Sequence, residues 1–161
     1  MSNNHLTGTI PQEFGDLSSL EVLDLSSNNL TREIPIRLEH CLKLNSLKFS
    51  SNELSGAIPS QLGDLNLHDV LDLSDNLFNG KIPTQLSKLT ILQKMNLSHN
   101  DLVGGIPSSF QLMMGLISFD ISYNSLEGPV PENHFFEEAP IKWFTHNNGL
   151  CGQVHGLPRC N

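Results

Sequence analysis

Basic residues are scarce in this sequence, and long apolar runs are missing. The chain of 161 residues carries nine Lys and Arg against 17 Asp and Glu, which gives a formal net charge of −8. We expect no nucleic-acid binding, because no basic patch is available to neutralise phosphates. No apolar run approaches the roughly 20 residues of a membrane span. The first residues, Met1 to His5, lack the basic and apolar stretches of a signal peptide.

Aromatic residues and cysteines are also few. Aromatic side chains make up 6% of the chain, and there are three cysteines. No Cys/His cluster has the spacing of zinc ligands, and no histidine pair has the spacing that metalloproteases use. Paired carboxylates do occur, but they fall at the fixed interval of a sequence repeat, described below, so they indicate a solvated face rather than acid–base machinery. We predict no enzyme activity, no metal and no cofactor.

Leucine and asparagine dominate instead, and they recur at a fixed interval. The chain has 27 Leu and 16 Asn. Every 24 residues the sequence returns to an asparagine and then to a proline, at Asn4, Asn28, Asn52, Asn76, Asn100 and Asn124 and at Pro11, Pro35, Pro59, Pro83, Pro107 and Pro131. Such a period predicts stacked structural units, each of which buries its apolar face only against its neighbours.

A single unit shows what the repeat dictates. Leu23 and Leu25 alternate with a polar residue, which predicts a short strand, and stacked units then form a parallel sheet with strands about 4.8 Å apart. The buried turn after the strand needs partners for its N–H and C=O groups, and an asparagine side chain supplies donors and an acceptor. The Ile-Pro step that follows begins a single helical or 3₁₀ turn. We therefore predict a structural ladder formed by Asn28, Asn52, Asn76, Asn100 and Asn124.

Three columns of the repeat contain exceptions. Glycine stands two residues before the isoleucine of the Ile-Pro step in most units, which predicts a positive φ there, but Arg32 takes this place in one unit. Leu77 comes one residue early in its leucine column, with Phe78 in register. His68 stands where the other units have leucine, which leaves the packing of that unit open.

The repeat resembles that of a known family. Residues 20–28 and 54–65 match the two halves of the plant-type leucine-rich repeat, LxxLxLSxNxLxGxIPxxLGxL. The tail from Phe144 to Gly152, with Cys160 following, is similar to the FxGNxGLCG…C cap that ends the ectodomains of plant leucine-rich-repeat receptor-like kinases, among which the MDIS1-interacting receptor-like kinase group is most similar. The resemblance implies an α/β fold: a right-handed leucine-rich-repeat solenoid with a parallel sheet on its concave face and short helical or 3₁₀ turns on its convex face. The kinase motifs themselves are missing from this sequence.

The resemblance divides the chain into leucine-rich repeats at residues 1–131, the first of them incomplete, and a C-terminal cap at residues 132–161. Cys151 and Cys160 close a short loop in the cap, and we predict a disulfide between them if the chain is secreted; the alternative is two free thiols. Cys41 occupies a leucine column and is expected to be a buried thiol. Aromatic residues of the cap are expected to cover the last coil, whereas the first coil has no cover and should expose Leu6, Ile10, Phe14 and Leu17.

The function implied by the resemblance is recognition without catalysis. The chain corresponds to the membrane-proximal part of a plant receptor-kinase ectodomain, on the extracellular face of the plasma membrane or in the apoplast, which binds a peptide or protein ligand or a co-receptor ectodomain. One alternative is a soluble apoplastic inhibitor of a pathogen enzyme, similar to polygalacturonase-inhibiting repeats. Another is an ice-binding repeat protein, which needs a flat face of regularly spaced Thr, Ser or Asn. The irregular loop column argues against it: Thr9, Glu33, Ala57, Lys81, Gly105 and Pro129.

The concave face is where a solenoid binds a partner. Its outward columns hold six acids against two lysines, which indicates either an acidic strip for a basic partner or an exposed sheet kept soluble by charge. We predict partner-binding residues toward the capped end, and among them we favour the rings because tyrosine offers a large contact area with few rotatable bonds. These residues are Asp72, Asp75, His99, Asp120 and Tyr123. N-glycosylation sequons begin at Asn29 and Asn96 and are usable if the chain enters the secretory pathway.

Overall fold

The strands predicted from the leucine alternation form one parallel sheet in the computed structural model, which describes all 161 residues. Its five strands are β2 (Val22–Asp24), β4 (Ser46–Lys48), β6 (Val70–Asp72), β8 (Lys94–Asn96) and β10 (Ser118–Asp120). The 24-residue period is confirmed by the pairing, which aligns Leu23, Leu47, Leu71, Met95 and Phe119 across the sheet.

A second parallel sheet, which the sequence analysis did not predict, follows the asparagine turns. Its order is β1-β3-β5-β7-β9-β11-β12. The strands are β1 (Thr7–Gly8), β3 (Asn29–Arg32), β5 (Glu53–Ala57), β7 (Leu77–Gly80), β9 (Asp101–Gly104), β11 (Ser125–Pro129) and β12 (Gly149–Cys151). Stacking places these extended segments beside one another, so that their N–H and C=O groups find partners in the next coil.

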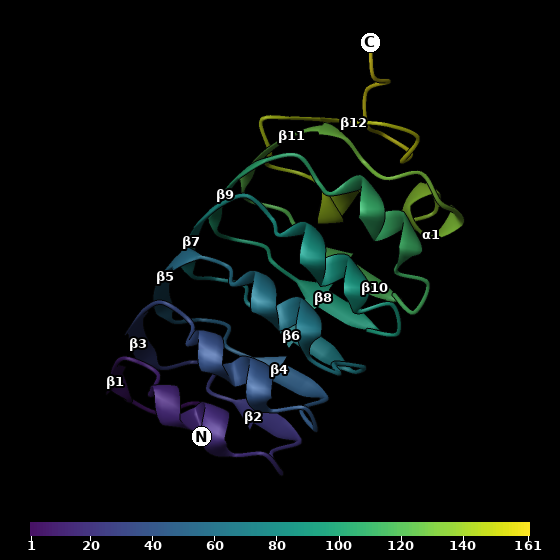
Figure 1. The fold of residues 1–161 in the computed structure, drawn as a ribbon. Helices are drawn as coiled ribbons and strands as arrows, with labels where there is room; N and C mark the ends of the chain where they lie inside the picture. The colour runs from purple at the N-terminus through teal and green to yellow at the C-terminus, as the bar shows by residue number, and fades with distance from the viewer.

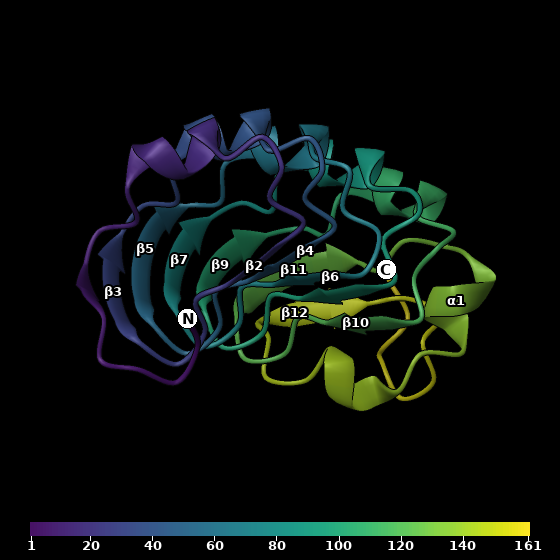
Figure 2. The ribbon, with the colours of Figure 1, turned by 90° about the horizontal axis from the view of Figure 1, so that it is seen from below.

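Short 3₁₀ helices form the third side of each coil, as the Ile-Pro step predicts. They are η1 (Gln12–Asp16), η2 (Ile36–His40), η3 (Ser60–Asp64), η4 (Thr84–Lys88) and η5 (Ser108–Leu112). Each follows a proline, whose fixed φ suits a helix entry; the Leu38 N–H, for example, donates to the Pro35 carbonyl at 3.2 Å. Figure 1 shows the coils stacked from the N-terminus to the C-terminus, and Figure 2, which looks along the stack, shows the helices along one side with the strands on the others.

The core between these three sides shows how two breaks in the leucine columns are accommodated. Phe78, not Leu77, fills the leucine column, because Phe78 is fully buried while Leu77 is 50% exposed. In the unit that carries His68, Leu67 takes the buried place and His68 is exposed. The backbone changes to allow this: Leu65 has an extended ψ of 161° after η3, whereas Cys41 at the equivalent position has a ψ of 63°.

The two ends of the solenoid differ. At the C-terminal end, α1 (His134–Glu137) and η6 (Ile141–Trp143) pack over the last coil, with Phe136 and Phe144 fully buried. At the N-terminal end Leu6 and Leu17 are exposed and Phe14 is half-buried. The expectation that Ile10 is exposed is wrong. Ile10 is 4% exposed because its inward column also faces the neighbouring coil.

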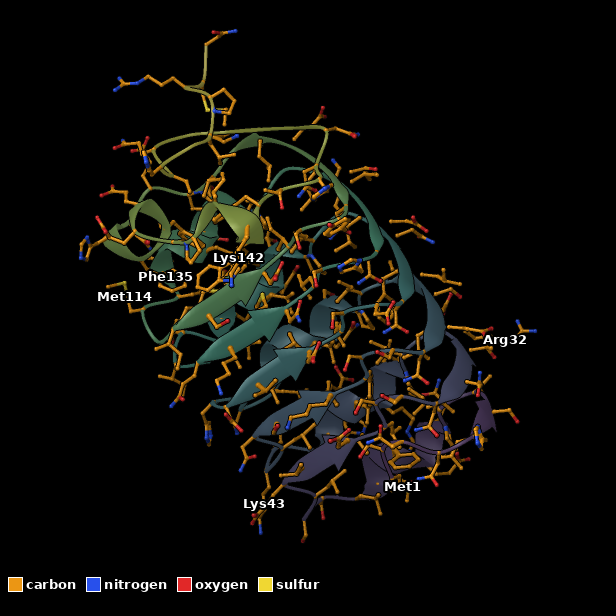
Figure 3. All side chains as sticks on the ribbon, turned by 180° about the vertical axis from the view of Figure 1, so that it is seen from behind. Met1, Arg32, Lys43, Met114, Phe135 and Lys142 are labelled. Carbon is orange, nitrogen blue, oxygen red and sulfur yellow. A yellow bond between two sulfur atoms is a disulfide. The ribbon has the colours of Figure 1, made fainter.

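Replacing Arg32 with glycine should raise the free energy of unfolding by about 1 kcal/mol. Arg32 has a φ of 68°, in the column where Gly8, Gly56, Gly80, Gly104 and Gly128 have φ values of 76–85°. A side chain in this conformation costs roughly 1–2 kcal/mol, partly offset by the freedom that glycine adds to the unfolded chain. The Arg32 side chain makes no ion pair and points away from the coils (Figure 3).

Urea unfolding followed by circular dichroism measures this change. The matched control is the reverse substitution Gly80→Arg, where a Cβ meets open space, so only the backbone cost is added. Gly80→Arg should therefore lower stability by a similar amount. A loss of stability in Arg32→Gly would contradict the strain argument.

Candidate functional site

Three of the predicted partner-binding residues, Asp75, His99 and Tyr123, share one column at the edge where the first sheet ends. This exit column takes one residue from each coil, directly before an asparagine of the repeat, and consists of Asn3, Ser27, Ser51, Asp75, His99, Tyr123 and His146. Every member has a positive φ of 53–58°. Such a conformation is uncommon for a bulky residue, so the coil holds strained backbone along this edge.

Buried neighbours fix the direction of the Asp75, His99 and Tyr123 side chains. Ser98 and Asn100, on either side of His99, are both buried. The His99 N–H donates to the Ser122 carbonyl of the next coil at 2.9 Å, and the Tyr123 N–H donates to the Thr145 carbonyl at 3.0 Å. The backbone that carries these side chains is therefore fixed before a partner arrives, which reduces the entropy cost of binding.

Three rings of the exit column stack face to face, and we name them the ring stack: His99, Tyr123 and His146. The centroids of His99 and Tyr123 are 4.1 Å apart, and those of Tyr123 and His146 are 3.9 Å apart, with interplanar angles of 13° and 7°. All three rings are exposed, Tyr123 to 45%. Sequence reasoning missed His146, although Thr145-His146-Asn147 follows the Ser-x-Asn pattern of the coils, because it lies in the cap and 23 residues after Tyr123 rather than 24.

The other two predicted residues, Asp72 and Asp120, lie in the middle of the concave sheet. Asp72 Oδ1 accepts hydrogen bonds from the N–H and the hydroxyl of Ser74, at 3.1 and 2.6 Å. Asp120 is held in the same way by Ser122, at 2.9 and 2.7 Å. Both carboxylates are half-buried and each commits one oxygen to the end of its own strand. The candidate residues thus form two groups, one exposed and unpaired at the edge and one engaged in the sheet.

Asp24 lies in the same column of the first sheet as Asp72 and Asp120, at its N-terminal end, and shows how such hydrogen bonds affect a carboxylate. Burial alone would raise the pKa of its carboxyl group. The hydrogen bonds from Ser26 and the positive charge of Lys48 outweigh burial and lower the pKa below its usual value. Asp24 therefore stays ionised although one of its oxygens is engaged by Ser26.

The predicted asparagine ladder lies directly behind the exit column. Asn76 Nδ2 donates to the carbonyls of Phe49, Leu73 and Ser74, at 2.9, 3.3 and 3.0 Å, and its Oδ1 accepts from the Leu54 N–H at 3.0 Å. Asn147, which sequence reasoning did not include, continues the ladder into the cap through the Leu126 N–H and the Ile121 carbonyl. Equivalent bonds are made by Asn28, Asn52, Asn100 and Asn124.

The cysteines divide as their positions suggest. A disulfide joins Cys151 in β12 to Cys160. Cys41 is a buried free thiol that donates to the Phe14 carbonyl, and burial, together with the negative charge of Asp16, raises the pKa of its thiol. No three His, Cys, Asp or Glu side chains converge as metal ligands. None of the helices combines the length and the apolar character that crossing a bilayer requires.

Comparison with known proteins identifies the family. The leucine-rich repeat model matches residues 1–17, 19–41, 43–65, 69–89 and 92–113. The chain belongs to the leucine-rich repeat family. Its repeats are homologous to those of plant receptor-like kinases and receptor-like proteins: the leucine-rich repeat receptor-like serine/threonine-protein kinase RGI4 of Arabidopsis thaliana is 58% identical over 36 residues, which cover 22% of this chain and 3% of that protein.

Solved structures extend the likeness to the whole solenoid. The ectodomain of the plant membrane receptor kinase GASSHO1/SCHENGEN3 from Arabidopsis thaliana, in complex with CASPARIAN STRIP INTEGRITY FACTOR 2, matches 98% of this chain with 40% identity and a TM-score of 0.91. The Arabidopsis receptor kinase HAESA, in complex with the peptide hormone IDA and the co-receptor SERK1, matches 99% with 32% identity and a TM-score of 0.83. The chain spans 19% and 26% of those two chains. A plant ice-binding protein is a weaker match, with 26% identity over 97% of this chain, 64% of its own length and a TM-score of 0.55.

Proposed function

We propose that this chain is a non-catalytic recognition module, the membrane-proximal part of a plant receptor-kinase ectodomain, and that it binds a peptide or a co-receptor at the capped end of its concave face. The similar ectodomains of GASSHO1/SCHENGEN3 and HAESA were solved with a partner bound, which supports this class of function. A receptor ectodomain also implies an extracellular location, at the plasma membrane or in the apoplast.

The ring stack is the observation that carries this proposal. Exposed aromatic groups are enriched at protein interfaces because they bury a large area for few rotatable bonds. In this chain the only Tyr residue lies between two exposed His rings, at a backbone position that a smaller side chain would occupy at lower cost. A strained backbone that presents rings to solvent favours binding over a purely structural role.

Glycosylation of the two sequons would shape the binding surface. Asn96 Oδ1 accepts from Ser98, while its Nδ2 donates no hydrogen bond within the chain, so a glycan on Nδ2 leaves the local bonds intact. A glycan there would cover the middle of the concave sheet between Asp72 and Asp120. Asn29 is exposed in β3, on the second sheet. We propose that a secreted, modified chain keeps the ring stack open and loses access to the middle of the strip.

Tyr123→Asn should weaken binding of a co-receptor ectodomain of the SERK1 kind by about ten-fold, the size expected for loss of an aromatic contact of roughly 1.4 kcal/mol. Asparagine is the chosen replacement because it tolerates the left-handed backbone that alanine does not favour. Biolayer interferometry with the immobilised chain, with and without a candidate peptide, measures the affinity. The matched control is Ser27→Asn, the same replacement in the same column at the far end of the solenoid.

Two results would count against this placement. Equal loss in Tyr123→Asn and Ser27→Asn would show that the column supports the fold rather than the partner. Unchanged binding in Tyr123→Asn together with loss in Asp72→Asn would move the contact to the middle of the sheet.

A further inference from the structure

One outer face of the ring stack belongs to His99 and looks toward the N-terminal end. The next residue of the exit column in that direction is Asp75. The two lie one coil apart, since the Asn76 N–H donates to the His99 carbonyl at 3.1 Å and the Asp75 N–H donates to the Ser98 carbonyl at 3.0 Å. Asp75 carries no ring, and its carboxylate ends closer to the backbone than an imidazole does. The outer part of the His99 face is therefore not covered by another ring.

Asp75 differs from the acids in the middle column of the concave face, Asp24, Asp72 and Asp120. It is exposed, and its carboxylate takes part in no ion pair and accepts no hydrogen bond within the chain. Asp24, Asp72 and Asp120 each accept a hydrogen bond from the hydroxyl of the serine two residues later. Asp75 cannot do this, because the residue two positions on is the exposed Leu77 of the second sheet. A carboxylate with all of its acceptor sites free thus lies beside an uncovered ring face.

We propose that the slot between Asp75 and His99 binds an arginine side chain of the partner. A guanidinium is planar, stacks on aromatic faces and pairs with a carboxylate through two parallel hydrogen bonds. Lying on His99 it would continue the stack as a fourth plane, close to the 3.9 and 4.1 Å separations of the rings. Its N–H groups would then point toward Asp75. This inference rests on the proposed recognition function and names the chemical group that the partner presents.

The same geometry disfavours other groups. A lysine ammonium pairs with Asp75 but has no plane to stack on His99. A ligand carboxylate is repelled by Asp75, and an uncharged ring leaves that carboxylate without a partner. The net charge of −8 attracts any basic segment to the molecule, so selectivity for arginine over lysine is what separates the slot from general attraction.

Nuclear magnetic resonance titration of the whole chain tests the slot with two small probes, N-acetyl-arginine amide and N-acetyl-lysine amide. Arginine should bind about three-fold or more tightly than lysine and shift the resonances of Asp75 and His99 most. Asp75→Asn should weaken arginine binding about five-fold. The control Asp69→Asn removes the same charge from an exposed acid on the other edge of the concave face and should leave arginine binding unchanged.

A second pair of variants separates stacking from charge. His99→Asn should weaken arginine binding about three-fold, whereas His68→Asn, at an exposed histidine outside the exit column, should not. Asparagine keeps the left-handed backbone at position 99. Equal effects of Asp75→Asn and Asp69→Asn, or no preference for arginine over lysine, would overturn the slot. Either outcome would overturn the slot alone if Tyr123→Asn still lowers the affinity for the co-receptor, because the proposed function would then remain supported.

Discussion

Phe119→Ala is expected to lower the free energy of unfolding by about 3–5 kcal/mol, the range for truncating a buried aromatic residue. Phe119 is fully buried in β10, where the repeats meet the cap. Its ring centroid lies 6.2 Å from that of Phe110 in the last 3₁₀ helix of the repeats, and 5.2 and 6.2 Å from those of Phe136 and Phe144 in the cap. The substitution removes the one ring that contacts all three, so the cavity opens between the two parts of the chain.

Urea unfolding followed by far-ultraviolet circular dichroism measures the loss, and hydrogen exchange locates it. Protection should fall first in residues 132–161, because the cap loses its main contact with the last coil. Phe135→Ala serves as the control. Phe135 is only half-buried and packs at the outer side of the cap against Trp143, with 6.0 Å between centroids, so its loss should cost less. Equal losses in the two variants would show that Phe119 does not join the cap to the repeats.

Asn76→Ala is expected to cost about 1–3 kcal/mol, although it removes only a small side chain. Asn76 is 7% exposed and its amide makes four hydrogen bonds to backbone groups of two neighbouring coils. Without it the Leu54 N–H, which is buried, has no acceptor. Water cannot reach these groups easily, so the full cost of leaving them unpaired appears in the free energy of unfolding.

The matched control for Asn76 is Asn79→Ala, an asparagine three residues later in β7. Asn79 is exposed and its side chain makes no hydrogen bond within the chain, so this variant should change the stability by less than about 0.5 kcal/mol. Chemical denaturation of both variants gives the comparison. A similar small loss in both would mean that the turn is satisfied without the ladder.

The first sheet could be predicted because every coil repeats large apolar residues at the same inward positions. Where the column is broken, the sequence did not show how the backbone would respond. Leu67 reaches the core only because the chain leaves η3 in an extended conformation. Phe78 rather than Leu77 is buried because the Phe78 N–H donates to Asn100, the ladder asparagine of the next coil, which fixes the register of this segment. The second sheet was missed because its short strands lack a regular alternation; their order comes from stacking rather than from their own residues.

For the candidate site, the sequence could predict only that it lies on the concave face and which residues share a column there. The 24-residue period placed Asp75, His99 and Tyr123 in one column, but it could not show that their rings stack or that His146 joins them. From the period alone, Asp72 and Asp120 were predicted to bind a partner just as Asp75 was. What separates them is the residue two positions later, a serine that occupies one carboxylate oxygen in the first two cases and a leucine in the third.

The spacing of side chains in the exit column limits how a peptide partner can bind to it. The column presents one side chain per coil, at the strand spacing of about 4.8 Å, while an extended peptide presents side chains on one face about 6.8 Å apart. A peptide lying along the solenoid axis therefore falls out of step with the column within two or three coils. Only one or a few side chains of a peptide can therefore contact the exit column. A long peptide makes its further contacts by running away from the column, across the concave face, rather than along it.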